Sequence, residues 1–332
     1  MGKQPTLKDV ATIAQVSEMT VSRVLRGKED TTQATRDRVL KAAKSVGYVP
    51  NRIAGSLSSK RVPLVGLIVP SLSNMVFSEV VMGVTKGLET TGLQPVFGVS
   101  HYDLKTEEQV ILEMLSWRPS GLIVAGLEHT ADATRAMAAA DIPVVEIMDT
   151  DGNPADFNVG ISQIDAGREM GQAFLARGYK KIGFIGTKMP ADFRAQKRLE
   201  GFSGALAAAG QTVVGAEYHQ GGSTLVIGRK MTAALLARCP DLDGIYYSTD
   251  YLAAGGLLHC LDTGIDVPKQ LGIAGFNGIE LLDGLPKKIA TTNAGRFETG
   301  LKAADLIQKS LNGEDPERIV KLDTVLDPGE TL

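Results

Sequence analysis

The sequence predicts a small all-α domain followed by a larger α/β region built on parallel sheets. Apolar residues repeat at helical spacing up to residue 47, whereas short apolar strands alternate with helical stretches from residue 62 onward. The charge divides at the same place: residues 1–61 hold 12 Lys/Arg and 5 Asp/Glu, a net +7, and the remainder has a net −10. A chain of 332 residues, 43% of them hydrophobic, can also bury more than one core.

The first helix is expected over residues 6–14. The letters TLKD place a hydroxyl and an acid three residues apart, which satisfies the free amides at a helix start. Ser17 can cap a second helix that ends near Leu25, and the intervening AQV has room only for a tight turn. The two helices therefore cross steeply, as a helix-turn-helix. The apolar residues expected on their inner faces are Val10, Ile13, Ala14, Val16, Val21 and Val24.

The stretch TTQATRDRVLKAAKSVGY predicts a third helix, capped by Thr32 and ended by Gly47. The apolar residues that repeat along it are Val39, Leu40, Ala43 and Val46. We place the helical domain at residues 1–49 and a linker at residues 50–61, because PNRIAGSLSSKRVP is small, polar and basic between two prolines. The linker has weak helical potential, and we expect it to fold only on binding.

Two similar α/β halves make up residues 62–332 in this prediction. Strands are expected at LVGLIVP, PVFGVS, GLIVAG and VVEIM, and again after residue 165 at KKIGFIG, GIYYST, LGIAGF and IATTNA. Helices are expected at residues 78–91, 106–117, 195–209, 226–238 and 250–263. Strands that alternate with helices form parallel sheets covered by helices, and such sheets bind ligands at the carboxyl ends of their strands.

Several classes of protein are disfavoured by what the sequence lacks. The start MGKQPTLKDV has no export signal and no window is apolar enough for a membrane span, so we expect a cytoplasmic protein with no membrane partner. A periplasmic binding protein would carry such a signal and would lack a basic first domain, so both features argue against that class. Cys239 and Cys260 lack metal-site or redox spacing and read as buried thiols, so no metal or cofactor is expected. GxxxxGK[ST], GxSxG and GxGxxG are absent, which disfavours an enzyme.

The motifs together resemble one family along essentially the whole chain. TLKDVATIAQVSEMTVSRVL, TRDRVLKAAKSVGYVPNRIAGSL, VGLIVPSLSNMVF, RLEGF and GIAGFN look like the lactose-repressor (LacI/GalR) family of bacterial transcription regulators. The stretch SHYDLKTEEQVILEMLSWRPSGLIV, the His-Thr pair at 129–130 and PVVEIMDT are similar to the gluconate-operon repressors of that family. The resemblance implies a periplasmic-binding-protein-like core with an N-subdomain at about 62–162, a C-subdomain at about 163–290 and C-terminal segments that cross between them. It also implies association with the bacterial nucleoid.

By this resemblance, the helix that starts at Ser17 reads DNA bases in the major groove. Glu18, Met19 and Arg23 fall on the base-reading positions: a carboxylate accepts from cytosine, a thioether packs on a thymine methyl and a guanidinium grips guanine. The alternative for these residues is an ordinary solvated helix face. The residues expected to position the protein on the DNA backbone are Thr6, Ser17, Thr20, Ser22 and Asn51, together with the Lys and Arg of the third helix.

The segment NRIAGSLS matches the hinge helix of the family. Asn51 is its implied cap, and Leu57, with Arg52, is implied to enter the minor groove and kink the operator centre. Gly55 departs from a good helix and costs about 0.5–1 kcal/mol there relative to Ala. Gln15 stands where the family usually has a turn glycine, and a left-handed backbone would cost it on the order of 1 kcal/mol.

The resemblance also assigns an effector site in the core. The residues it implies are Asn74, Phe77, Asp149, Arg194, Arg198, Asp250 and Asn277. Because Arg198 can hold a carboxylate bidentately, with Lys188 and Arg194 nearby, a sugar acid such as gluconate is favoured. A neutral sugar, a phosphorylated sugar or a co-repressor remains the alternative, and Asp149 argues against an anion. Structural roles are open as well: an ion pair for Arg198, a turn acid for Asp149 and core packing for Phe77.

One helix-turn-helix buries too little surface for tight binding, so a homodimer on a palindromic operator is expected. The end LDTVLDPGETL lacks a heptad tail that would tie dimers into tetramers. Closure of the core around the effector is expected to release the operator.

Overall fold

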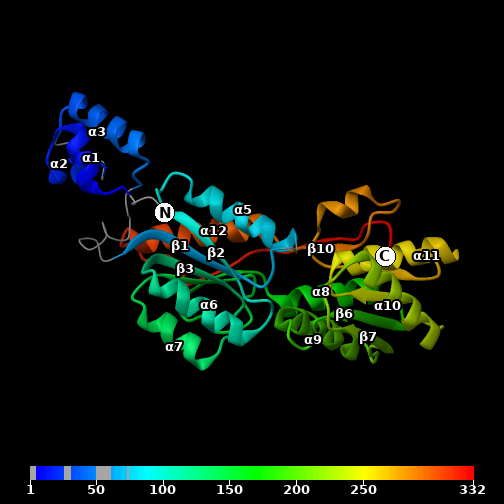
Figure 1. Cartoon of the computed structure of the whole chain (residues 1–332). Coiled ribbons are helices and arrows are strands. Elements are labelled where there is room, and N and C mark those ends of the chain that lie inside the picture. Colours follow the sequence, from blue (N-terminus) through cyan, green and yellow to red (C-terminus); the bar gives the residue numbers. More distant parts are fainter. Residues whose placement is uncertain (1–4, 26–30, 50–60, 73–74) are drawn as a thin grey trace. The chain divides into compact units, whose positions relative to one another are not determined.

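The computed structural model describes residues 5–25, 31–49, 61–72 and 75–332, and the chain divides into two compact units, Met1–Val62 and Pro63–Leu332 (Figure 1). Among the helices it describes, none has the length and apolar character needed to span a bilayer. The limits of domains and subdomains predicted from the sequence stay our proposal, whereas the elements below are observed. Of the two cysteines, Cys260 is buried and Cys239 is half-buried.

The first unit consists of three helices: α1 (Leu7–Ala14), α2 (Glu18–Leu25) and α3 (Gln33–Val46). The predicted caps are present. The Thr6 hydroxyl accepts from the backbone N–H of Asp9, whose carboxylate accepts from the N–H of Thr6 in return. The hydroxyls of Ser17 and Thr32 accept from the amides of the residues three positions on. Gly47 ends α3 with a φ of 66°.

Most of the predicted apolar contacts form the core of this unit. The fully buried residues include Val10, Ala14, Val21, Val24, Val39 and Ala43. Ile13 and Leu40 were expected on inner faces, but 53% and 48% of their surfaces are exposed. A helix of eight residues turns only a narrow stripe toward its neighbours, and Ile13 lies outside that stripe. Gln15 follows α1 with φ 54° and ψ 48°, the left-handed conformation that the sequence predicts to be strained.

The first half of the larger unit is a six-stranded sheet in the order β11-β5-β4-β3-β1-β2, and its described pairings are parallel. Its strands are β1 (Val62–Val69), β2 (Gln94–Val99), β3 (Pro119–Ala125), β4 (Val144–Ile147), β5 (Phe157–Gly160) and β11 (Ile319–Lys321). The helices are α5 (Met75–Leu88), α6 (Leu104–Ser116), α7 (Ala131–Ala139) and α12 (Arg296–Leu311). Helices α5 and α12 share one core with the sheet, and α6 and α7 share another. We call this half the N-subdomain.

The second half, the C-subdomain, is a parallel four-stranded sheet in the order β7-β6-β8-β9. Its strands are β6 (Ile182–Thr187), β7 (Gly215–His219), β8 (Gly244–Tyr247) and β9 (Gly272–Ala274). Helices α8 (Gln163–Ala176) and α9 (Phe193–Ala208) belong to one core, and α10 (Leu225–Arg238) and α11 (Asp250–Thr263) to the other. A short helix η1 (Glu280–Gly284) and an antiparallel pair of β10 (Thr291–Asn293) and β12 (Val325–Asp327) complete it.

The chain passes between the two subdomains three times. It crosses from β5 to α8, returns from β10 to α12, and crosses again from β11 to β12 (Figure 1). Helix α12 therefore packs on α5, more than two hundred residues earlier in the sequence. Each sheet accordingly contains or adjoins segments from distant parts of the chain.

Paired glycines let three pairs of helices approach closely. A Cβ on Gly167 of α8 would lie 2.0 Å from the carbonyl oxygen of Arg198, and one on Gly201 of α9 would lie 1.9 Å from that of Ile164. The same reciprocal arrangement joins α5 to α12 and α10 to α11; the glycines are Gly83 and Gly300 in the first pair and Gly228 and Gly255 in the second. Side chains larger than hydrogen have no room at these crossings.

Candidate functional site

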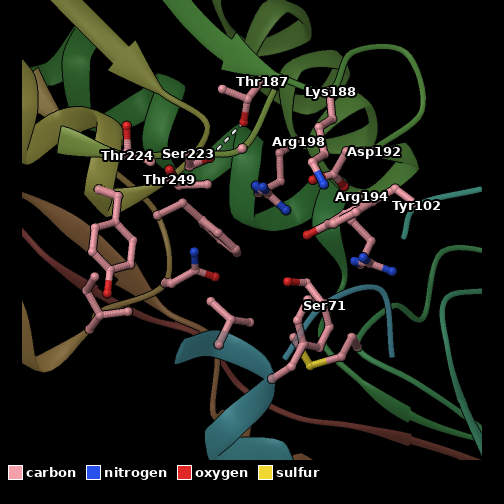
Figure 2. Close-up of a pocket in the computed structure, with 18 of the residues that line it drawn as sticks. Ser71, Tyr102, Thr187, Lys188, Asp192, Arg194, Arg198, Ser223, Thr224 and Thr249 are labelled. Atoms are coloured by element: carbon pink, nitrogen blue, oxygen red, sulfur yellow. Dashed lines mark hydrogen bonds between the residues drawn. The ribbon is translucent and has the colours of Figure 1, made fainter. Parts of the chain in front are cut away.

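A cavity of about 560 Å³ lies between the two subdomains, at the carboxyl ends of their strands (Figure 2). The N-subdomain contributes Phe77 of α5, Tyr102 after β2 and Met148 after β4, and the C-subdomain contributes segments that follow β6, β8 and β9. The polar lining residues are Ser71, Tyr102, Gln163, Thr187, Lys188, Asp192, Arg194, Arg198, Ser223, Thr224, Thr249, Tyr251 and Asn277. The parallel sheets place the cavity where such sheets commonly bind ligands.

Arg198 is the most deeply buried cation of the lining, with 5% of its surface exposed. One guanidinium nitrogen donates to Gln163 Oε1 at 2.5 Å and another to the Ser248 carbonyl oxygen at 3.1 Å. Its face lies 3.8 Å from the ring centre of Phe276, and its Nε has no hydrogen-bond partner. No carboxylate of the described residues hydrogen-bonds this guanidinium. A buried positive charge without a hydrogen-bonded carboxylate is costly, and an anionic group placed against it would lower that cost.

Two further cations face the cavity. Lys188 and Arg194 project toward it from the segment before α9 and from the first turn of α9 (Figure 2). Lys188 Nζ lies 3.9 Å from the ring centre of Tyr102, and burial lowers the pKa of this lysine. The one carboxylate among the described lining residues, Asp192, caps α9 by accepting from Ala195 N at 3.1 Å. The described part of the lining therefore has three cations to one anion.

Asn277 lines the opposite part of the cavity with a strained backbone, φ 124°. Arg296 at the start of α12 donates to the carbonyl oxygens of Asn277 and Gly278 and to Glu79 Oε1 of α5, the last at 2.8 Å. Because Arg296 is buried and makes all three contacts, it fixes a loop of the C-subdomain against two helices of the N-subdomain.

Asp250 holds the same loop, residues 277–279, through hydrogen bonds. It is fully buried at the start of α11 and accepts from the Thr291 hydroxyl at 2.7 Å and from Ile279 N at 3.1 Å. Burial raises the pKa of Asp250 to about 6, against the lowering effect of these hydrogen bonds. Asp250 was implied to touch the effector, but it does not line the cavity, because its carboxylate is occupied in holding the 277–279 segment.

Asp149 is likewise buried and not among the residues that line the cavity. Its carboxylate is fully buried and lies 2.5 Å from Lys197 Nζ, and its Oδ1 accepts from Asp151 N at 2.9 Å. Burial raises the pKa of Asp149, although the hydrogen bond from Lys197 opposes the shift. Asp149 is therefore paired with Lys197 inside the protein, and its effect on the choice of ligand stays a prediction.

The structure thus brings four of the implied effector residues together around one cavity: Phe77, Arg194, Arg198 and Asn277. Asn74 lies outside the described residues. The sequence analysis missed the hydroxyl-rich part of the lining, which includes Tyr102, Thr187, Ser223, Thr224 and Thr249. Their signal was their position directly after expected strands or directly before expected helices.

The residues predicted to read DNA bases lie together on α2. Glu18, Met19 and Arg23 are exposed, Met19 with 66% of its surface, while Val21 and Val24 on the same helix are buried. The Ser17 and Thr20 hydroxyls are 2.9 Å apart at the start of the helix, and Ser22 is half-buried. The base-reading and backbone-positioning roles stay predictions. Asn51, Arg52 and Leu57 lie outside the described residues. Among the described residues, no group of His, Cys, Asp and Glu forms a metal-binding cluster.

A helix-turn-helix unit joined to a two-subdomain α/β unit with an enclosed cleft defines a ligand-responsive transcription regulator. Residues 6–51 match the model of bacterial regulatory proteins of the lacI family, and residues 62–321 match that of periplasmic binding proteins and the sugar-binding domain of the LacI family. The chain belongs to the LacI family and is a DNA-binding transcriptional regulator.

Individual relatives match along nearly the whole chain. The HTH-type transcriptional regulator GntR of Pseudomonas aeruginosa is 35% identical over 99% of this chain and 94% of its own, and GntR of Escherichia coli is 33% identical over 99% of both. The crystal structure of a LacI-family transcriptional regulator from Silicibacter pomeroyi is 56% identical, with a TM-score of 0.95 over 98% of this chain and 99% of that one. Members of the family bind DNA operators and small-molecule effectors and act as dimers.

Proposed function

We propose that this regulator senses a sugar acid such as gluconate in the cavity between its subdomains. The observation that carries the proposal is the buried Arg198 guanidinium, which has an unpartnered Nε and no bonded carboxylate among the described residues. Lys188 and Arg194 add positive charge, and the hydroxyls of Ser223, Thr224 and Thr249 suit a polyhydroxylated ligand. The similarity to regulators named GntR agrees with this choice.

The alternatives differ in how well they match these charges. A neutral sugar would leave the excess positive charge of the lining uncompensated, so the cleft disfavours it. A phosphorylated sugar acid would satisfy more than one cation, and the cavity of about 560 Å³ has room for a ligand of that size. The experiment below therefore compares the three classes directly.

We further propose that a homodimer represses transcription from a palindromic operator, with Glu18, Met19 and Arg23 reading bases. Exposed apolar side chains lie on adjoining elements of the N-subdomain and suit a subunit interface; they are Met82 of α5, Phe97 of the edge strand β2 and Phe297 of α12. A regulator of bacterial DNA acts in the cytoplasm, where its operator lies.

The switch we propose is a change in the angle between the subdomains. Because the cavity is lined from both, a ligand that binds the closed arrangement better shifts the equilibrium toward closure. The shift is bounded by that difference in affinity, typically about 1–3 kcal/mol of coupling between sites. We favour release of the operator by the effector over co-repression.

Calorimetry and operator footprinting test the effector. At one stated salt concentration, D-gluconate and 6-phosphogluconate are compared with glucose for the wild type and Arg198→Met. We expect an acid to bind and release the operator, and Arg198→Met to lose about 2–5 kcal/mol of binding free energy, since it removes the buried cation. The exposed Arg135→Met serves as the control. Equal binding of glucose and both acids, or full affinity in Arg198→Met, would contradict the proposal.

A further inference from the structure

A second set of charges spans the cleft outside the cavity lining. Lys197 Nζ of α9 lies 2.7 Å from Glu128 Oε1 and 2.5 Å from Asp149 Oδ2, and it donates to the Asp151 carbonyl oxygen at 3.1 Å. Glu128 lies between β3 and α7, and Asp149 follows β4, so both carboxylates belong to the N-subdomain. Lys197 belongs to the C-subdomain. One ammonium group therefore joins the two halves through three acceptors.

The two sides of this contact are each held rigidly. On the N-subdomain, His129 lies directly after Glu128 and is fixed by Glu107 at 2.6 Å and Glu146 at 3.1 Å. On the C-subdomain, α9 packs closely on α8 through Gly167 and Gly201, where the two backbones approach each other without intervening side chains. Lys197 thus connects a well-packed segment of the N-subdomain to a well-packed helix of the C-subdomain.

Burial strengthens the contribution of the Lys197 contacts to the stability of this arrangement. Asp149 is fully buried and the Lys197 side chain retains only 18% exposure, so neither charge is well solvated in this structure. Separation of the subdomains would withdraw Lys197 from its acceptors and leave Asp149 without its counter-ion. Surface ion pairs, in contrast, contribute little.

We propose that Lys197, with Glu128 and Asp149, is a clamp across the cleft that sets the closed population and thereby the affinity for the effector. Lys197 acts as a positioning residue, because it does not line the cavity as the structure describes it. Apparent affinity falls in proportion to the population of the binding-competent state, so loss of the clamp weakens binding without loss of a ligand contact. This link to affinity rests on the proposed effector function; the effect on closure does not.

The variants Lys197→Met and Glu128→Gln separate the clamp from the binding site. Glu128→Gln removes the negative charge of a side chain that is 28% exposed and leaves the Lys197–Asp149 pair intact, so it tests the clamp even if Lys197→Met fails to fold. Lys181→Met is the matched control, since Lys181 pairs with Asp241 at 3.1 Å on the exposed surface of the C-subdomain alone. Lys197→Arg keeps the charge and should restore closure.

Hydrogen–deuterium exchange of the full chain without ligand gives the first measurement. We expect faster amide exchange at residues 126–130 and 188–197 in Lys197→Met, a smaller increase in Glu128→Gln and none in Lys181→Met. Titration with D-gluconate gives the second, with affinity roughly tenfold weaker in Lys197→Met through faster dissociation. Adding Glu128→Gln to Lys197→Met should change neither readout further.

Unchanged exchange and affinity in a folded Lys197→Met, or unchanged exchange in Glu128→Gln should Lys197→Met not fold, would overturn the clamp. A wild type that binds no D-gluconate would instead contradict the proposed effector, and the exchange measurement would still decide the clamp.

Discussion

His129 is a buried histidine held between two carboxylates, Glu107 of α6 and Glu146 of β4. Burial by itself would lower the pKa of His129, but the hydrogen bonds and charges of the two glutamates outweigh it and raise the pKa to about 9. The imidazole is therefore charged at neutral pH and neutralises part of the buried negative charge.

The raised pKa predicts a loss of stability in alkali. A pKa above the unfolded value of about 6.5 means that His129 stabilises the fold fully below that pH and loses its contribution as pH rises through about 9. We expect the difference in unfolding free energy between wild type and His129→Gln to shrink by on the order of 3 kcal/mol across this interval. Urea denaturation at several pH values measures it. His259→Gln is the control, since burial lowers the pKa of His259 and leaves it neutral there.

Arg23 tests base reading by a single side chain. On α2 it is exposed beside Met19 and Glu18, where a guanidinium can reach a guanine edge. We expect Arg23→Ala to cost roughly 1–3 kcal/mol on the operator and little on random DNA, as measured by fluorescence anisotropy. Lys41→Ala, on the exposed face of α3, should weaken both about equally and reduce the salt dependence. An equal loss on both DNAs for Arg23→Ala would refute base reading.

At the scale of an element, α9 shows how helix packing positions the site. It carries Arg198 and Lys197, and its contact with α8 depends on glycines. We expect Gly201→Ala to destabilise the fold by at least about 2 kcal/mol, since its Cβ would meet backbone. Gly204→Ala on the same helix meets nothing within 4 Å and should stabilise by about 0.5–1 kcal/mol. Thermal and urea unfolding compare the two, and similar melting of both variants would argue against the packing.

Periodicity and caps predicted the helices of the first unit and most strands of the second, because those signals are local. The three-residue strands β11 and β12 carry no such pattern. They pair with β5 and β10, which lie earlier in the chain and in different subdomains. For the site, the family resemblance rather than a local pattern pointed to Arg198 and Asn277, and both line the cavity. The effector contacts predicted for Asp149 and Asp250 stay predictions. The partners of these two carboxylates within the protein, Lys197 and Thr291, lie more than forty residues away in sequence, so no local pattern indicates them.

At the scale of the molecule, the proposed dimer depends on an apolar face of the N-subdomain. Met82 of α5 is 55% exposed and Phe97 of β2 is 41% exposed. We expect Met82→Glu to shift the protein toward monomers in sedimentation velocity and to weaken operator binding, because buried charge at an interface is costly. Val214→Glu, on an equally exposed residue of the C-subdomain, should leave the dimer intact. A dimeric Met82→Glu would place the interface elsewhere.

The threefold passage of the chain between subdomains also governs what a shortened gene can produce. A polypeptide stopped after β10 would contain every strand of the four-stranded sheet, yet it would lack α12 and β11 of the other half. The close-packed glycine surface of α5 and the edge of β5 would then face water. Late nonsense mutations should therefore damage the N-subdomain, although most of it is encoded first. Neither subdomain can be expressed intact from one uninterrupted stretch of codons.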